Sequence, residues 1–169
     1  MKKEKMNDKG FSLVELIIVI AIMAVLVVVL APQYLKYVEK SRNSTDLSNA
    51  TAIVTALQVY AADPDATVPL KKDEVITIKV ASDKGEVTAD NAGKAGEAAL
   101  KNASIEVSDI KCKSKSKWTY YQISAKVEES GSLKFTYSCD TGDAFEKAMS
   151  GENTTTSGGT GAGDAGGTT

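Results

Sequence analysis

Residues 9–26 read KGFSLVELIIVIAIMAVL, and they begin an apolar run that extends from Phe11 to Ala31, interrupted only by Ser12 and Glu15. At about 1.5 Å per residue, a helix over this run is roughly 30 Å long, which matches the hydrocarbon core of a bilayer. A carboxylate inside a membrane costs on the order of 3 kcal/mol and usually marks function. A simple membrane anchor accounts for the length of the run but leaves Glu15 unexplained, unless that side chain lies at the interface and is solvated.

The composition excludes several classes of protein. The chain has 169 residues and a net charge of −2, so it is not a strongly basic nucleic-acid binder. It contains no histidine, which removes His-ligated metal sites, Ser-His-Asp triads and Cys-His dyads. Asp140 and Asp143 suggest an acidic turn rather than a calcium site, because no complete ligand set is visible. We therefore expect no enzymatic activity, no metal site and no cofactor.

The stretch from Lys9 to Leu26 closely resembles the start of a type IV pilin. The resemblance implies that a prepilin peptidase cleaves between Gly10 and Phe11 and methylates the new amine of Phe11. The apolar run then stays attached to the mature protein, whereas an ordinary secretory signal is removed. Ordinary signal cleavage is also disfavoured here, because Ala31-Pro32-Gln33 after the run is a poor cleavage point, where the proline obstructs cleavage.

Cleavage after Gly10 explains why Glu15 is there. The new ammonium group on Phe11 and the carboxylate of Glu15 can neutralise each other in a medium of low dielectric constant. The resemblance implies that this pairing also occurs between neighbouring subunits, so that Glu15 sets the register of assembly. A lone buried charge is far more costly than a paired one, which favours one stagger of the subunits over others.

Pro32 removes one backbone hydrogen bond, so it should either kink the helix or stop it. We expect a kink, because helical periodicity continues beyond Pro32. Apolar residues recur at steps of three or four up to Asp63-Pro64, which ends the pattern and predicts one helix from Phe11 to Ala62. The residues of this stripe are Leu47, Ala50, Ile53, Val54, Leu57 and Tyr60. The polar stretch from Glu39 to Asp46 is expected to be exposed.

The rest of the chain predicts a small α+β domain. Alternating or β-branched stretches predict four strands, at Val75–Val80, Ser104–Ile110, Trp118–Val127 and Leu133–Ser138, and residues 90–102 predict a short helix. The fold class is a long protruding N-terminal helix packed in its second half on an antiparallel four-stranded sheet, like a type IV pilin. The expected parts are a leader at 1–10, a transmembrane and filament-core half-helix at 11–32, a globular head at 33–150 and a disordered tail at 151–169.

The two cysteines, Cys112 and Cys139, are the right number for one disulfide in an oxidising compartment. The resemblance supports a disulfide, because many pilins carry one near the C-terminus. Two buried free thiols are the alternative, since the sequence does not show the Cα separation.

Residues 111–117 read KCKSKSK and form a basic stretch. A solvated turn is the favoured interpretation. The alternative is electrostatic contact with DNA or with another anionic surface such as a receptor.

The predicted function is that of a structural subunit of a type IV pilus. The chain is expected to start in the cytoplasmic membrane and then to form an extracellular homopolymer, assembled by other pilus proteins, with roles in twitching motility, adhesion or aggregation. One alternative is a pseudopilin of a type II secretion or DNA-uptake system, and another is a monomeric membrane-anchored binding domain.

Overall fold

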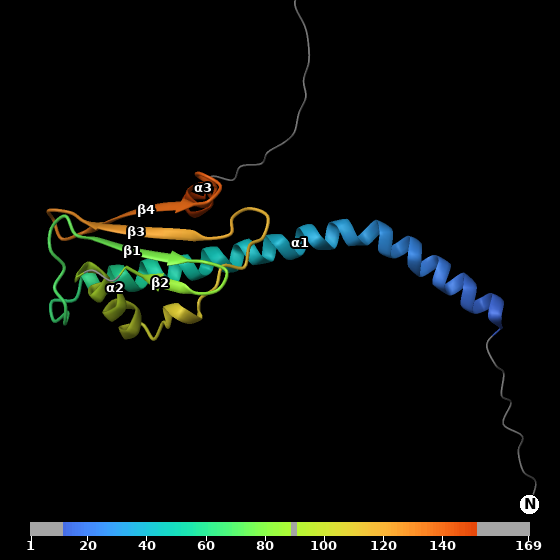
Figure 1. The fold of residues 1–169 in the computed structure, drawn as a ribbon, viewed down its shortest axis with the longest axis horizontal. Coiled ribbons are helices and arrows are strands. Elements are labelled where there is room, and N and C mark those ends of the chain that lie inside the picture. Colours follow the sequence, from blue (N-terminus) through green and yellow to red (C-terminus); the bar gives the residue numbers. More distant parts are fainter. Residues whose placement is uncertain (1–11, 89–90, 152–169) are drawn as a thin grey trace, which may run out of the picture. The chain divides into compact units, whose positions relative to one another are not determined.

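The computed structural model describes residues 12–88 and 91–151 of the chain, and Figure 1 shows its elements. In order they are α1 (Leu13–Ala61), β1 (Val75–Val80), β2 (Gly85–Val87), α2 (Asn91–Asn102), the 3₁₀ turn η1 (Val107–Asp109), β3 (Tyr121–Val127), β4 (Leu133–Cys139) and α3 (Ala144–Ser150). The chain divides into two compact units, residues 1–42 and residues 43–169. Each unit is described separately below.

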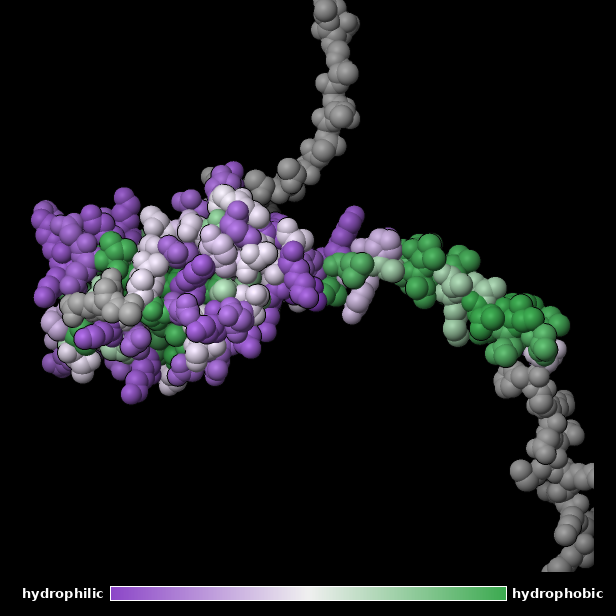
Figure 2. Space-filling view, in the orientation of Figure 1, coloured by the Kyte–Doolittle hydropathy of each residue, from purple (hydrophilic) through white to green (hydrophobic). Residues whose placement is uncertain are grey.

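The predicted long helix is confirmed over the described residues, where α1 continues without a break through Pro32. The kink at Pro32 stays a prediction. Among the described residues, α1 is the one helix that is long and apolar enough to cross a membrane, judged by length and composition. Figure 2 shows hydrophobic side chains along the first half of this helix.

The sheet has the strand order β2-β1-β3-β4, and every neighbouring pair is antiparallel. Ile78 of β1 lies opposite Ile123 of β3, which in turn lies opposite Tyr137 of β4. Alternate residues of β1 and β3 are buried, as expected for a sheet with one face against the core. The predicted α+β class with a four-stranded antiparallel sheet is therefore confirmed.

The core lies between this sheet face and the second half of α1, which runs along the sheet in Figure 1. The predicted helical stripe is confirmed, because Ala50, Ile53, Leu57 and Tyr60 are all buried. Helix α2 adds Ala95, Ala99 and Leu100 to the same core. Gly96 permits this contact, since a Cβ there would lie 2.6 Å from Cγ2 of Ile76.

One predicted strand is wrong and one real strand was missed. Residues 104–110 do not form a strand: Ser104 has a positive φ of 57°, and η1 follows it. These residues turn the chain after α2, and the amide of Ile105 bonds to the carbonyl of Leu100. The fourth strand is instead β2, a three-residue edge strand that is too short to show a period of two.

Helix α3 was also missed, and it closes the end of the core beside β4. Its Phe145 is fully buried. The Phe145 ring stacks on Tyr121 at 4.4 Å and meets Trp118 edge-on at 5.0 Å. Such aromatic pairs add roughly 0.5–1.5 kcal/mol beyond the area that they bury.

Candidate functional site

The first half of α1 exposes its large apolar side chains. From Leu13 to Leu30 their exposed fractions run from 45% at Val19 to 74% at Val28. A contiguous apolar surface of this size is unfavourable in water and marks a surface that contacts lipid or protein. This segment, residues 13–30, is called the apolar segment below.

Glu15 lies in the first turn of α1, where it serves the helix itself. The backbone N–H of Ser12 donates to Oε2 of Glu15 at 3.0 Å. This is half of a capping box, in which the residue at the third helical position accepts a hydrogen bond from the N-cap residue. The spacing Ser-x-x-Glu at residues 12–15 is a sequence signal for this bond. Gly10 and Phe11, the predicted cleavage and methylation site, lie outside the described residues.

A second polar site lies in the second unit, centred on the carboxylate of Asp46. Oδ1 accepts the backbone N–H of Lys113 at 2.7 Å, and Oδ2 accepts that of Ser114 at 2.9 Å. Oδ2 also accepts the indole N–H of Trp118 at 2.9 Å. The Sγ of Cys112 lies 3.5 Å from the same oxygen. These donors compensate for the burial of a fully enclosed carboxylate.

The prediction that the whole stretch from Glu39 to Asp46 is exposed is therefore wrong at Asp46, and Glu39, Arg42 and Asn43 are half-buried. Asp46 stands four residues before Ala50 and seven before Ile53, on the buried face of the helix. That position was visible in the sequence as an extension of the apolar stripe. An acidic residue on an apolar stripe signals a buried hydrogen-bonded site.

The contacts of Asp46 fix the backbone of residues 111–117, called the lysine loop below. Within it Cys112 and Ser114 are buried, and the four lysines between and beside them are exposed. The Oγ of Ser114 also accepts the backbone N–H groups of Lys117 and Trp118, at 3.3 and 3.4 Å. Buried hydrogen bonds therefore fix the backbone of the loop, and its lysine side chains are exposed.

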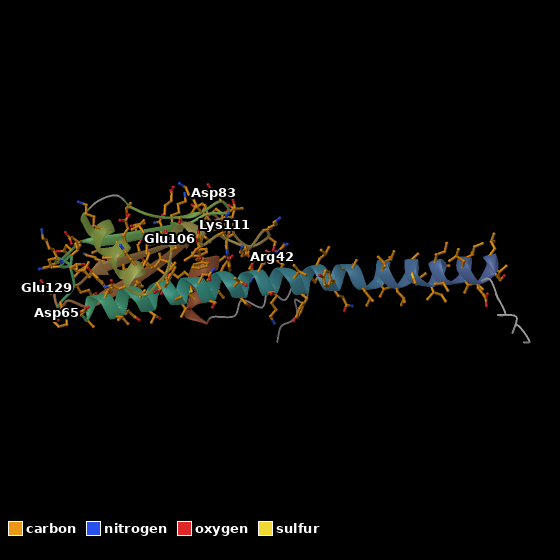
Figure 3. All side chains as sticks on the ribbon, turned by 90° about the horizontal axis from the view of Figure 1, so that it is seen from below. Arg42, Asp65, Asp83, Glu106, Lys111 and Glu129 are labelled. Carbon is orange, nitrogen blue, oxygen red and sulfur yellow. The ribbon has the colours of Figure 1, made fainter. Side chains whose placement is uncertain are left out.

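The surroundings of the lysine loop carry both signs of charge. The amide of Cys112 bonds to the carbonyl of Ala81, which brings the loop beside the turn between β1 and β2. Asp83 lies in that turn and Glu106 directly precedes η1, on the segment that leads into the loop; Figure 3 labels both together with Lys111. This mixed charge favours the interpretation of a solvated turn over a dedicated polyanion site.

The two cysteines are free thiols in the structure, so the predicted disulfide is not formed there. Cys112 faces Asp46 and the carbonyl of Trp118, whereas Cys139 faces Thr141 and the carbonyl of Gly142. Burial and the neighbouring Asp46 carboxylate raise the pKa of the Cys112 thiol to about 12. The same two causes raise the pKa of the buried Tyr121 hydroxyl far above its usual range.

The acidic turn near the end of β4 also has protein partners. Asp140 accepts the backbone N–H of Thr119 at 2.9 Å and its hydroxyl at 2.6 Å, and these bonds lower the pKa of the carboxyl group. Asp143 pairs with Lys147 at 2.7 Å. Within residues 12–88 and 91–151, no group of three or more acidic, cysteine or histidine side chains is placed to hold a metal ion.

Comparison with known proteins gives one family model, which matches near the N-terminus, and several relatives. The family model described as the prokaryotic N-terminal methylation motif matches residues 5–31. Prepilin peptidase-dependent protein A of Clostridium perfringens (strain 13 / Type A) is 34% identical over 95 residues, which make up 53% of this chain and 64% of that protein. Type IV major fimbrial protein FimA of Dichelobacter nodosus is 37% identical over 59 residues, 35% of this chain and 38% of that protein.

A third relative, type IV major pilin protein PilA of Myxococcus xanthus (strain DK1622), is 32% identical over 59 residues, 35% of this chain and 27% of that protein. The chain thus spans less than two thirds of the length of each of these relatives. No solved structure matches the chain significantly. By the methylation motif over residues 5–31 and by these relatives the chain is similar to type IV pilins, and its long helix joined to a four-stranded antiparallel sheet is consistent with the type IV pilin fold.

Proposed function

We propose that this chain is a structural subunit of a type IV pilus that polymerises through its apolar segment. The observation that supports this most is the conjunction of a methylation motif over residues 5–31 with large apolar side chains that are all exposed from Leu13 to Leu30. Lipid can cover this surface before assembly, and identical helices can cover it afterwards. The chain acts as a building block and a peptidase substrate, with no chemistry of its own.

The processing steps are part of the proposal. A prepilin peptidase removes residues 1–10 by cleavage between Gly10 and Phe11, and the new amine of Phe11 is methylated. That amine then pairs with Glu15, within one chain or across two copies. The relative from Clostridium perfringens carries "prepilin peptidase-dependent" in its name, which supports the assignment of this processing to the present chain.

The expected division of the mature chain is also proposed: 11–32 for the membrane and filament core, 33–150 for the head, and 151–169 for a tail. The chain starts in the cytoplasmic membrane and ends in a surface filament. Twitching motility, adhesion and aggregation are the proposed roles of that filament. Contact of the lysine loop with DNA is a weaker proposal, which the salt dependence of DNA binding by purified filaments tests.

The deciding experiment is to shear filaments from the cell surface and to identify their bulk protein by mass spectrometry. We expect this chain to dominate and to begin at an N-methylated Phe11. A chain that is found only in membranes and retains Met1–Gly10 would support a monomeric anchored domain instead. A processed chain that is a trace component of secretion machinery would support a pseudopilin.

A further inference from the structure

The two edges of the sheet differ in what covers them. Strand β2 forms one edge, and η1 lies against it, since a Cβ on Gly85 would come within 2.4 Å of the carbonyl oxygen of Val107. Strand β4 forms the other edge, as Figure 1 shows, and among the described residues no strand but β3 pairs with it. That pairing runs through seven consecutive residues without a bulge. A regular edge of this length can bind a further strand.

The backbone groups that β4 leaves unpaired follow from the direction of the hydrogen bonds in the sheet. The N–H of Val127 donates to the carbonyl of Glu74, and the carbonyl of Val127 accepts the N–H of Asp73, so Val127 bonds toward β1. The bonding direction alternates along a strand, so the even-numbered residues of β3 bond toward β4. Their partners there are the even-numbered residues of β4. The N–H and C=O groups of residues 133, 135 and 137 therefore point away from the sheet.

The side chains of these odd-numbered residues are only partly covered. Leu133, Phe135 and Tyr137 pack at the margin of the core and are half-buried, whereas Ile123 on the adjacent strand is completely buried. Half-exposed apolar side chains beside an unpaired edge mark a surface that another strand can cover. The strand contains one charged residue, Lys134, and no proline, so it has little of the protection that keeps an edge single.

The strand that matches this edge is β4 of a second copy. Two copies of one edge can pair antiparallel about a two-fold axis, which makes the contact self-complementary. With the axis at Phe135, this residue lies opposite itself and Leu133 lies opposite Tyr137 of the other copy, so the unpaired backbone groups of both strands meet. Lys134 then lies opposite the uncharged Thr136 of the other copy, and the half-exposed apolar side chains cover one another.

Charge and the turn after β4 disfavour the two adjacent registers. An axis at Lys134 would place two lysines directly opposite each other, which is destabilising. An axis at Thr136 would place Leu133 opposite Cys139, whose edge is already bridged to Gly142. The register centred on Phe135 is therefore the one that uses every unpaired group of the edge.

We propose that β4 pairs with β4 of a second copy in a neighbouring filament, so that filaments adhere through antiparallel strands centred on Phe135. This inference rests on the proposed filament function and deepens its aggregation role. The two-fold axis reverses the direction of one head, whereas subunits repeated by one screw operation all point the same way. The contact therefore joins separate filaments. Each contact is small, but it repeats along both filaments, and multivalency strengthens the whole.

Cysteine cross-linking between separately purified filaments tests the contact and its register. Filaments with Lys134→Cys are mixed with filaments with Thr136→Cys, both at exposed positions, so a cross-link between the two variants joins two filaments. We expect about five times more cross-linked dimer than from Lys134→Cys filaments alone, because diagonal neighbours lie farther apart than opposite ones. A mixture of Lys134→Cys and Ser138→Cys filaments is the matched control for the register centred on Thr136 and should stay equally low. Parental filaments control for the two native cysteines, which are buried.

Charge at position 136 gives an independent readout. Thr136→Lys puts lysines opposite each other in every contact, and we expect the bundled fraction in low-speed sedimentation to fall about tenfold. Thr136→Glu should bundle at least as well as the parent, and the double variant Lys134→Glu, Thr136→Lys should bundle again, because opposite charges then meet. Thr136→Lys also brings the negative chain closer to neutrality, which by itself favours association, so dispersal would be specific to the contact. Position 136 is exposed, so all variants should keep their filament yield and melting temperature.

The contrary outcomes separate this contact from the proposed function. Bundles that survive Thr136→Lys, or equal cross-linking in all mixtures, would overturn the strand contact and leave the filament subunit standing. Residues 152–169 are the other candidate for the edge, because they follow α3 beside β4. If they occupied it, filaments of a chain that ends at Gly151 would bundle and parental filaments would not, which would also overturn the contact. Absence of filaments from the parental chain would overturn the proposed function itself.

Discussion

The first half of α1 is almost entirely apolar and the second half is apolar along one stripe, and the apolar side chains of the two halves are in opposite environments. Leu16 and Ile20 in the first half are 61% and 56% exposed, whereas Ile53 and Leu57 in the second half are buried. The second half finds its partner in the sheet of the same chain, and the first half has no such partner among the described residues. Hydrophobicity therefore predicts a helix in both halves. Only the elements that pack against each half show whether its apolar side chains serve folding or assembly.

The largest expected effect comes from removing the acid of the first half. Glu15→Val should abolish filaments, because an unpaired ammonium on Phe11 would then be buried in the filament core. The head domain should keep its melting temperature, since Glu15 lies in the other unit. Filament yield after shearing and circular dichroism of the purified chain measure the two effects. Normal yield from this variant would contradict the pairing.

Glu15→Gln separates the charge of Glu15 from its capping bond. An amide oxygen can still accept the N–H of Ser12, so the start of α1 keeps its cap. If charge compensation drives assembly, the Gln variant should fail nearly as severely as the Val variant. Full assembly by the Gln variant would assign the residue to helix capping alone.

In the second half the largest effect should follow from Asp46→Ala. Loss of the carboxylate leaves the amides of Lys113 and Ser114 and the indole of Trp118 without their acceptor. We expect the free energy of unfolding to fall by about 3–4 kcal/mol. Urea denaturation measures it, and Asp46→Asn, which keeps one acceptor oxygen, should lose less. A loss below about 1 kcal/mol for Asp46→Ala would show that water replaces the carboxylate.

The thiol of Cys112 should be nearly inert in the folded protein. A rise of its pKa from 9.0 to about 12 leaves about a thousand times less thiolate at pH 8. Because the folded pKa is raised, this thiol's contribution to stability is complete below about pH 9 and is lost as the pH rises toward 12. Labelling with a thiol reagent at pH 8, before and after adding denaturant, checks the reactivity in a Cys139→Ser background. Rapid labelling without denaturant would show that the Asp46 site opens readily.

The smallest effect is expected at the surface. Lys72 pairs with Glu129 between two exposed loops. Such a pair contributes less than about 1 kcal/mol and is screened by salt. Lys72→Ala should therefore leave the urea midpoint almost unchanged and have no effect on filament yield. A clear fall in either would give this end of the head an assembly role that its contacts do not indicate.

Regular periods made much of the fold predictable. The stripe from Ala50 to Tyr60, the strand Val75–Val80 and the hairpin that joins β3 and β4 all follow from spacing that one buried face imposes. The alternation in residues 104–110 was misleading, because the turn after α2 uses those residues to reverse the chain. Strand β2 has three residues and helix α3 has seven, and both were missed because such short elements do not show a recognisable hydrophobic period.

Prediction of the candidate sites was limited in the same way, because it also depended on local sequence patterns. The assembly role of Glu15 stays a prediction, made because its acid stands alone in an apolar run. The burial of Asp46 could be inferred from its place on the apolar stripe, but its hydrogen-bond donors could not, because they come from residues 113–118. No local pattern links positions nearly seventy residues apart. The free state of the two cysteines likewise depends on which neighbours the folded chain gives each thiol.

The alternation of inward and outward side chains in the lysine loop has an evolutionary consequence. Packing constrains the buried residues Cys112, Ser114 and Trp118, while the lysines between and beside them are exposed. These outer positions are free to drift in charge and size without loss of the fold. The same positions are therefore natural places to insert an epitope.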